Sequence, residues 1–141
     1  MSALNPGKPH IVHVTECMAG GTLGFLVQAV GALHDAGVKQ TLLFSRRPDS
    51  PQDIAGLFPP AVEQHELPAA RGMHWRFAAG LAKALHDVTH RHAADAVHLH
   101  SSKAGFVGRL VLARSGLATH CYYSPHGLSF LNQRRRIASR L

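Results

Sequence analysis

The sequence predicts an α/β fold in which a doubly wound parallel sheet forms a single domain. Strand-like and helix-like patterns alternate along the chain. No internal repeat, low-complexity tract or flexible linker divides it. A chain of 141 residues with 45% hydrophobic content can bury the core of one domain. The alternation implies right-handed βαβ units, with helices on both faces of a parallel sheet.

The first half of the chain predicts two strands joined by one helix. His10–Val14 is a short β-branched run that predicts a strand. After the turn at Ala19-Gly20-Gly21, apolar residues recur at helical spacing as far as Gly37, which is placed to end the helix. Thr41–Phe44 predicts a second buried strand. Ser45–Asp53, with two prolines and two arginines, predicts a loop.

The second half predicts three more strands. Ala61–Leu67 is a weaker strand candidate, Ala96–His100 a stronger one, and Thr119–Ser124 the last. A helix precedes the fourth strand, with an apolar face formed by Met73, Phe77, Leu81, Ala84, Leu85 and Val88. Another helix precedes Gly116 and is expected to bury Phe106, Val107, Leu110 and Val111. Arg134–Leu141 predicts a further helix.

Composition limits the classes of binding partner and the cellular compartment that we expect. The 15 lysines and arginines against 8 acidic residues give a net charge of +7, which attracts phosphates. No basic stripe interleaved with aromatics and no zinc-finger spacing is present, so we expect no nucleic-acid partner. No apolar run approaches the roughly 20 residues that span a bilayer, and Met1–Pro9 is unlike a signal peptide. We therefore expect a cytoplasmic protein with reduced thiols at Cys17 and Cys121.

The loops that follow the strands are the predicted ligand-binding segments. In a doubly wound sheet, ligands bind at the carboxyl ends of strands where the strand order reverses. These loops are Glu16–Thr22, Ser45–Asp49, Ser101–Lys103 and Pro125–Ser129.

The turn at Gly20-Gly21-Thr22 opens a helix, so its backbone amides can face an anionic group. Glycines at 20, 21 and 24 do not match the dinucleotide fingerprint, and a plain tight turn explains them as well. Ser45-Arg46-Arg47, at the end of the second strand, suits the additional phosphate of NADP. An NADP-binding oxidoreductase is therefore an alternative function, although a solvated basic loop explains the arginines better.

Histidine is abundant, with 12 residues, and two histidines share one strand face. His98 and His100 flank Leu99 and project together, whereas His10 and His13 fall on opposite faces of the first strand. Two histidines bind zinc only if a further ligand converges on them, so the sequence predicts no metal site. We expect His98 to be packed within the fold and His100 to face the ligand-binding edge.

For Lys103 and His126, the sequence allows either a binding role or an ordinary exposed position. Lys103 falls in the first turn of a helix, where a positive charge opposes the dipole, so it is either exposed or placed to bind an anion. His126 lies between Pro125 and Gly127 just beyond a strand end, where it can donate a hydrogen bond or exchange a proton near pH 7.

Two segments are similar to the fourth and fifth strand ends of the N-terminal domain of bacterial family 4 glycosyltransferases. They are Ala96–Gly105 (AVHLHSSKAG) and Tyr123–Phe130 (YSPHGLSF), and Gly20-Gly21 stands where those enzymes carry their first glycine-rich loop. The resemblance covers roughly residues 8–133 and implies a B-type glycosyltransferase, in which two Rossmann-like domains face each other across a cleft. The N-terminal domain shapes the acceptor side, and the C-terminal domain binds a nucleotide diphosphate sugar.

The resemblance implies sugar transfer with retention of configuration, usually without a bound metal and without a tightly bound cofactor. The nucleotide diphosphate sugar is the substrate, and the acceptor is a polysaccharide or a lipid-linked glycan. It implies that His126 contacts the donor sugar near the reacting carbon, as the catalytic residue. The other implied site residues are Gly20, Gly21 and Thr22 at the donor, with His100, Ser101, Lys103 and Gly127 along the cleft.

The sequence departs from that family in one large respect. The paired glutamates that engage the donor in the second domain have no counterpart here. We therefore expect residues 1–141 to be an acceptor-side domain without the donor-binding domain, inactive alone and prone to self-association through its exposed cleft wall. Another alternative is a noncatalytic module that docks on a partner chain or on the inner face of the membrane through the basic, partly aromatic segment 75–83.

Overall fold

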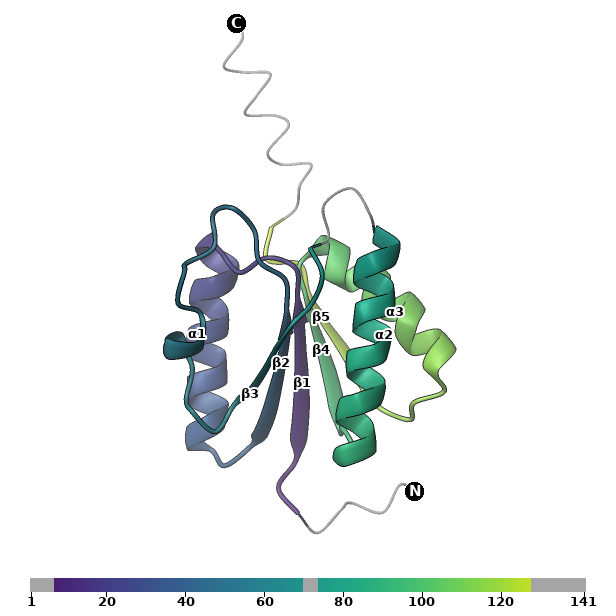
Figure 1. Cartoon of the computed structure of the whole chain (residues 1–141). Helices are drawn as coiled ribbons and strands as arrows, with labels where there is room; N and C mark the ends of the chain where they lie inside the picture. The colour runs from purple at the N-terminus through teal and green to yellow at the C-terminus, as the bar shows by residue number, and fades with distance from the viewer. Residues whose placement is uncertain (1–6, 70–73, 128–141) are drawn as a thin grey trace, which may run out of the picture.

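The computed structural model describes residues 7–69 and 74–127, which form one open sheet of five parallel strands in the order β3-β2-β1-β4-β5. The strands are β1 (His10–Thr15), β2 (Lys39–Phe44), β3 (Glu63–Glu66), β4 (Ala96–His100) and β5 (His120–Ser124). The helices are α1 (Gly20–Asp35), α2 (His74–Arg91) and α3 (Ser102–Ser115), with a 3-10 turn at Ala55–Leu57. Helix α1 covers one face of the sheet, and α2 and α3 cover the other (Figure 1).

The predicted fold class and the predicted order of elements are confirmed. Strand β3 is shorter than the predicted Ala61–Leu67. Gly37 (φ 80°) and Gly116 (φ 69°) adopt the left-handed conformation just after α1 and α3, as expected for glycines that end helices. The predicted helix at Arg134–Leu141 lies outside the described residues.

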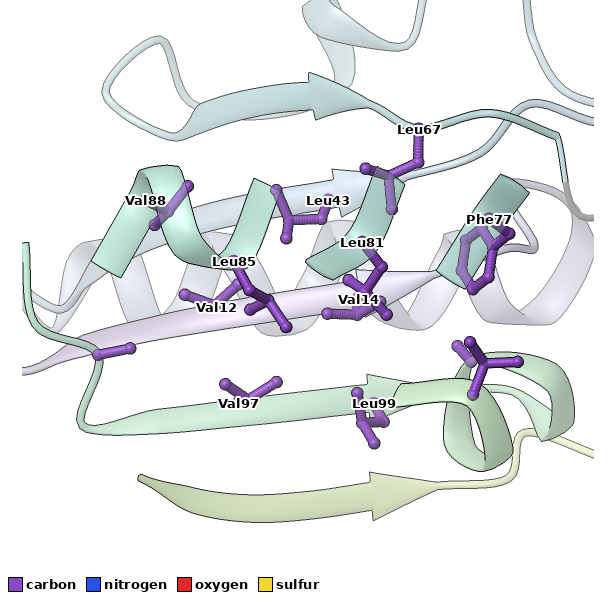
Figure 2. Packing of buried hydrophobic residues seen from close by; sticks show 13 residues of the cluster. Val12, Val14, Leu43, Leu67, Phe77, Leu81, Leu85, Val88, Val97 and Leu99 are labelled. Carbon is purple, nitrogen blue, oxygen red and sulfur yellow. The ribbon is translucent and has the colours of Figure 1, made fainter. Parts of the chain in front are cut away.

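The larger hydrophobic core lies between the sheet and the pair α2 and α3. Alternate side chains of a strand point to opposite faces, so β1, β2 and β4 each present apolar residues to these helices. Figure 2 shows the packing of Val12, Val14, Leu43, Val97 and Leu99 with Phe77, Leu81, Leu85 and Val88 of α2. Each fully buried side chain of this size contributes roughly 1.5–3 kcal/mol, so this layer is a main source of stability.

The second core lies under α1 and is confined to one side of the sheet. Leu42 and Phe44 of β2 are the strand residues of this core. It also contains Met18, Leu26, Val30, Ile54, Phe58 and Val62. The same face of β1 and β4 carries histidines instead, because His13 is in register with Leu42 on one side and with His98 on the other. Residues that are paired in register on neighbouring parallel strands point to the same face of the sheet. On the α1 face, the apolar core residues of β2 are therefore followed by histidine rings on β1 and β4.

Helix α3 packs on the sheet through small residues. A Cβ atom at Gly108 would lie 2.5 Å from Leu99 Cδ2, so the glycine permits a close approach of helix and strand. Val107 is buried and Val111 packs against the core, but Phe106 is 68% exposed and Leu110 is 43% exposed. The expectation that α3 buries Phe106 and Leu110 is wrong, because the small-residue side of the helix faces the sheet.

Cys17 and Cys121 are both free thiols, as expected, with Cys121 exposed on β5. None of the described helices combines the length and the apolar character that a membrane span requires.

Candidate functional site

The strand order reverses between β1 and β4, and the predicted site residues gather at this point. The chain leaves β1 for α1 on one face and leaves β4 for α3 on the other (Figure 1). Ligands of open α/β sheets bind beyond the carboxyl ends of the strands at such a reversal. Gly20, Gly21 and Thr22 follow β1, and His126 and Gly127 follow β5. His100 is the last residue of β4, and Ser101 and Lys103 come after it.

Four histidine rings, His13, His98, His100 and His126, form what we call the histidine cluster. His13 Nδ1 lies 3.2 Å from His100 Nε2, and His100 Nδ1 lies 2.8 Å from His126 Nε2. The rings of His98 and His100 have their centroids 3.9 Å apart and are tilted by 35°. His13 and His100 are fully buried, while His98 and His126 are half-buried. The cluster therefore runs from the core under α1 to the surface after β5.

An amide at the buried end sets the direction of these hydrogen bonds. Gln40 Nε2 donates to the Val30 carbonyl oxygen at 2.9 Å, so Gln40 Oε1 accepts from His13 Nε2 at 3.0 Å. In neutral rings, His13 Nδ1 then accepts from His100 Nε2, and His100 Nδ1 accepts from His126 Nε2. Nδ1 of His126 therefore keeps its lone pair and is able to accept a hydrogen bond from a ligand.

The surroundings keep the cluster neutral at pH 7. Burial lowers the pKa of His13 to about 4. Burial, and then repulsion from the other three rings, lowers the pKa of His100 to about 2. Burial also lowers the pKa of His98 and of His126 below the ordinary value. Neutral rings keep one lone pair each, so the cluster offers hydrogen-bond acceptors or metal ligands rather than positive charge.

Backbone strain is concentrated at the same edge. Among the described residues, Ser101 (φ 77°) and His126 (φ 52°) are the two non-glycine residues with positive φ. The Ser101 amide donates to the Ser124 carbonyl oxygen at 2.9 Å, which ties the end of β4 to the end of β5. Ser101 stands at the start of α3, but its side chain makes no capping hydrogen bond.

The glycine turn is joined to the histidine cluster through Phe25 of α1. Gly20 and Gly21 are exposed at the start of α1, and Thr22 is buried beneath them. The Phe25 ring lies 4.7 Å from the His126 ring, centroid to centroid. Gly127 follows directly, with a φ of 148° that favours glycine. The turn after β1 and the loop after β5 are thus brought together.

The remaining predicted ligands are either exposed to solvent or already paired with acidic residues. Lys103 is exposed in the first turn of α3. Arg46 Nε lies 3.0 Å from Glu66 Oε2, and Arg47 Nε lies 3.2 Å from Asp49 Oδ1. Both guanidinium groups of the alternative NADP site therefore have acidic partners, and this geometry does not favour that alternative.

Sequence reasoning missed three residues of the site, which are His13, Gln40 and Phe25. Side chains alternate along a strand, so the sequence placed His13 on the face opposite His10, and their different neighbours confirm this. The alternation does not say which strand lies next to β1, so the contact of His13 with His100 was not predictable. Gln40 and Phe25 carry no local signal, since their importance comes only from what they contact.

No protein-family model and no curated protein matches the sequence. Three solved glycosyltransferases resemble the chain in structure. Sucrose-phosphate synthase from Thermosynechococcus elongatus gives a TM-score of 0.68 at 16% identity, over 90% of this chain and 35% of the synthase. The lipopolysaccharide outer core galactosyltransferase WaaB gives 0.64 at 11% identity, over 83% of this chain and 33% of WaaB.

The third is Phytolacca americana UGT2, solved with UDP-2fluoro-glucose and pterostilbene, with a TM-score of 0.60 at 17% identity. That likeness covers 94% of this chain and 34% of UGT2. The chain therefore spans about one third of the length of each of these three proteins. By its fold, the chain is a Rossmann-like α/β domain similar to about one third of each of these glycosyltransferases.

Proposed function

We propose that the chain is the N-terminal, acceptor-side domain of a retaining glycosyltransferase. The complete enzyme transfers a sugar from a nucleotide diphosphate sugar to a polysaccharide or a lipid-linked acceptor. The observation that carries this proposal is the contact, at the reversal of the strand order, between His126 and Phe25 of the helix that begins at Gly20-Gly21. The likeness of the fold to three glycosyltransferases supports it.

The proposed roles follow from the local chemistry. The start of α1 carries unpaired backbone amides and the positive end of the helix dipole, which favour a phosphate. A Cβ atom at Gly20 or Gly21 would meet nothing within 4 Å, so this surface is open to a ligand. His126 Nδ1, which keeps its lone pair, accepts a hydrogen bond from a sugar hydroxyl in this proposal. Lys103, which is exposed in the first turn of α3, contacts the acceptor in this proposal. Ser101, whose hydroxyl is buried, ties the ends of β4 and β5 together through its backbone amide.

Titration of the 15N-labelled protein with UDP-glucose, GDP-mannose and ADP-glucose tests the binding role. We expect at least one of these donors to shift the backbone amides of Gly20, Gly21 and Gly127, with weak affinity because the partner domain contributes no contacts. His126→Ala is expected to reduce the shifts at Gly127. His34→Ala, an exposed change near the end of α1, serves as the control. Shifts confined to other surfaces with all three donors would contradict the proposal.

Sugar transfer by the isolated chain provides a second measurement. We expect no turnover of these donors by purified residues 1–141, because the resemblance assigns the donor-binding glutamates to a second domain. A transfer rate that His126→Ala abolishes would overturn that expectation, while strengthening the assignment of His126.

A groove between α2 and α3 favours a second candidate function, which is peripheral attachment to a membrane. It has a volume of about 700 Å³ and is lined mainly by apolar residues, with Arg114 at its border. Trp75 is 63% exposed and Phe106 is 68% exposed beside it. Exposed aromatic and basic side chains favour anionic lipid surfaces.

Sedimentation with phosphatidylserine vesicles at low salt tests this attachment. We expect Trp75→Ala with Phe106→Ala to abolish co-sedimentation, and Tyr122→Ala, an exposed aromatic on β5, to leave it unchanged. If the unchanged protein, the Trp75→Ala/Phe106→Ala variant and the Tyr122→Ala variant co-sedimented equally, the groove would not be the attachment surface.

A further inference from the structure

Three rings of the histidine cluster meet the geometric requirement for a metal ion. His13, His98 and His100 each offer one nitrogen atom, and these three atoms lie within 4.8 Å of one another. They come from two neighbouring strands whose register places His13 beside His98. We propose that His13, His98 and His100 form a binding site for Zn²⁺ or a similar divalent transition metal ion, whether or not the chain takes part in sugar transfer.

The donor set selects the class of ion. All three ligands are imidazole nitrogens, which suit zinc, cobalt, nickel and copper, whereas Mg²⁺ and Ca²⁺ prefer oxygen. Zinc binds histidine at about 2.0–2.1 Å in tetrahedral geometry, which places neighbouring ligand atoms about 3.4 Å apart. His13 Nδ1 and His100 Nε2 are already 3.2 Å apart. The ligand atom of the half-buried His98 ring lies within 4.8 Å of both.

If His98 coordinates through Nδ1, as this proposal requires, the second nitrogen of each ring already has a polar partner. His13 Nε2 bonds Gln40 Oε1 at 3.0 Å, and the Val30 carbonyl oxygen holds that amide in place. His98 Nε2 lies 2.8 Å from Ser124 Oγ. Histidines that bind metals commonly have such partners, which fix the orientation and tautomer of the ring.

The third ring, His100, uses His126 as its second partner. His100 Nδ1 lies 2.8 Å from His126 Nε2. Three ligands with ordered outer partners leave a fourth tetrahedral position for water or another molecule.

Metal binding changes the state of His126. When His100 Nε2 coordinates the ion, the proton of that ring sits on Nδ1 and is donated to His126 Nε2. His126 then carries its own proton on Nδ1, so its outward atom changes from a hydrogen-bond acceptor to a donor. Each ring keeps one proton throughout, so no proton is gained or lost.

The test starts by removing a competing site. His86 and His90 form an exposed pair on α2 with ring centroids 4.2 Å apart, and such a pair binds transition metals on its own. The parent protein for all measurements therefore carries His86→Gln and His90→Gln. Calorimetric titration with Zn²⁺ is expected to give one ion per chain, and Co²⁺ is expected to give the intense visible absorption of a tetrahedral ion.

Matched variants locate the ion. We expect His98→Gln to weaken Zn²⁺ binding at least tenfold and to remove the tetrahedral cobalt spectrum. His120→Gln, an exposed histidine on β5, is expected to change neither. Circular dichroism checks that both variants remain folded. Equal affinity in the two variants, or an octahedral cobalt spectrum in the parent, would overturn the proposal.

X-ray absorption spectroscopy at the zinc edge, on the parent protein loaded with Zn²⁺, identifies the ligands directly. Three imidazole ligands are the expected result, and one imidazole or an all-oxygen shell would also refute the site. The 15N chemical shifts of the His126 ring provide a separate readout. They are expected to change from the tautomer protonated on Nε2 to the tautomer protonated on Nδ1 when Zn²⁺ is added.

Discussion

Ser101 combines two unfavourable features at the start of α3. Its backbone angles, φ 77° and ψ 164°, fall in a region adopted almost only by glycine. Its Oγ atom is buried and has no hydrogen-bond partner among the described residues. Glycine would allow the same fold without either cost, so the serine is better explained by a role at the site than by stability.

Replacing Ser101 with glycine is therefore expected to stabilise the protein. Glycine removes the backbone strain and the buried hydroxyl but has more conformational entropy in the unfolded chain. We expect a net increase in the free energy of unfolding of about 1 kcal/mol. Ser102→Gly, the next residue and the first of α3, is expected to lower stability by about 0.5–1 kcal/mol. Urea unfolding of both variants measures the difference. A destabilised Ser101→Gly would show that the hydroxyl has a stabilising contact.

The buried histidines predict acid sensitivity. His13 and His100 have pKa values of about 4 and about 2 in the folded chain, against 6.5 when exposed. The unfolded chain therefore binds more protons below pH 6.5, and stability falls as the pH drops through that value. Each of the two rings costs about 2 kcal/mol between pH 7 and pH 5.

Urea unfolding at both pH values, in a chelator, measures this loss. His13→Gln is expected to reduce the pH dependence, and His34→Gln, an exposed control, to leave it unchanged. Stability that is constant from pH 7 to pH 5 would contradict the burial of neutral rings.

Among the helices, α3 shows how small residues direct packing. Gly105 faces the Tyr123 ring and Gly108 faces Leu99, so both positions allow the helix to lie close to β4 and β5. The pattern of large apolar residues on α3 suggested a different contact face. Because Phe106 and Leu110 are displaced from the sheet, they border the groove beside α2 instead.

Gly108→Ala is expected to destabilise the protein by about 1–3 kcal/mol, since its Cβ would lie 2.5 Å from Leu99 Cδ2 in the core. Gly31→Ala, inside α1, is the matched control because nothing lies within 4 Å of its Cβ. There alanine improves helix propensity, and we expect a gain of about 0.5–1 kcal/mol. Thermal unfolding of the two variants compares them. If Gly31→Ala lowered the stability as much as Gly108→Ala, the contact with Leu99 would not be the cause of the destabilisation.

Across the whole sheet, strand order decides which residues meet at the site. His13 and His100 are 87 residues apart in the sequence, and they lie side by side because β4 pairs with β1. The loops predicted from strand ends do lie at one edge, since all strands are parallel and share one direction. The role of each loop residue at that edge stays a prediction that the titrations above test.

Local patterns were sufficient for the alternation of elements, the helix ends at Gly37 and Gly116, and the shared face of His98 and His100. These features depend on residues within a few positions of one another, where backbone geometry links pattern to structure. Only the tertiary structure decided the hydrogen-bond chain from Gln40 to His126, the strain at Ser101 and the exposed side of α3. Each of these depends on which distant elements become neighbours, and that is settled by packing the entire core.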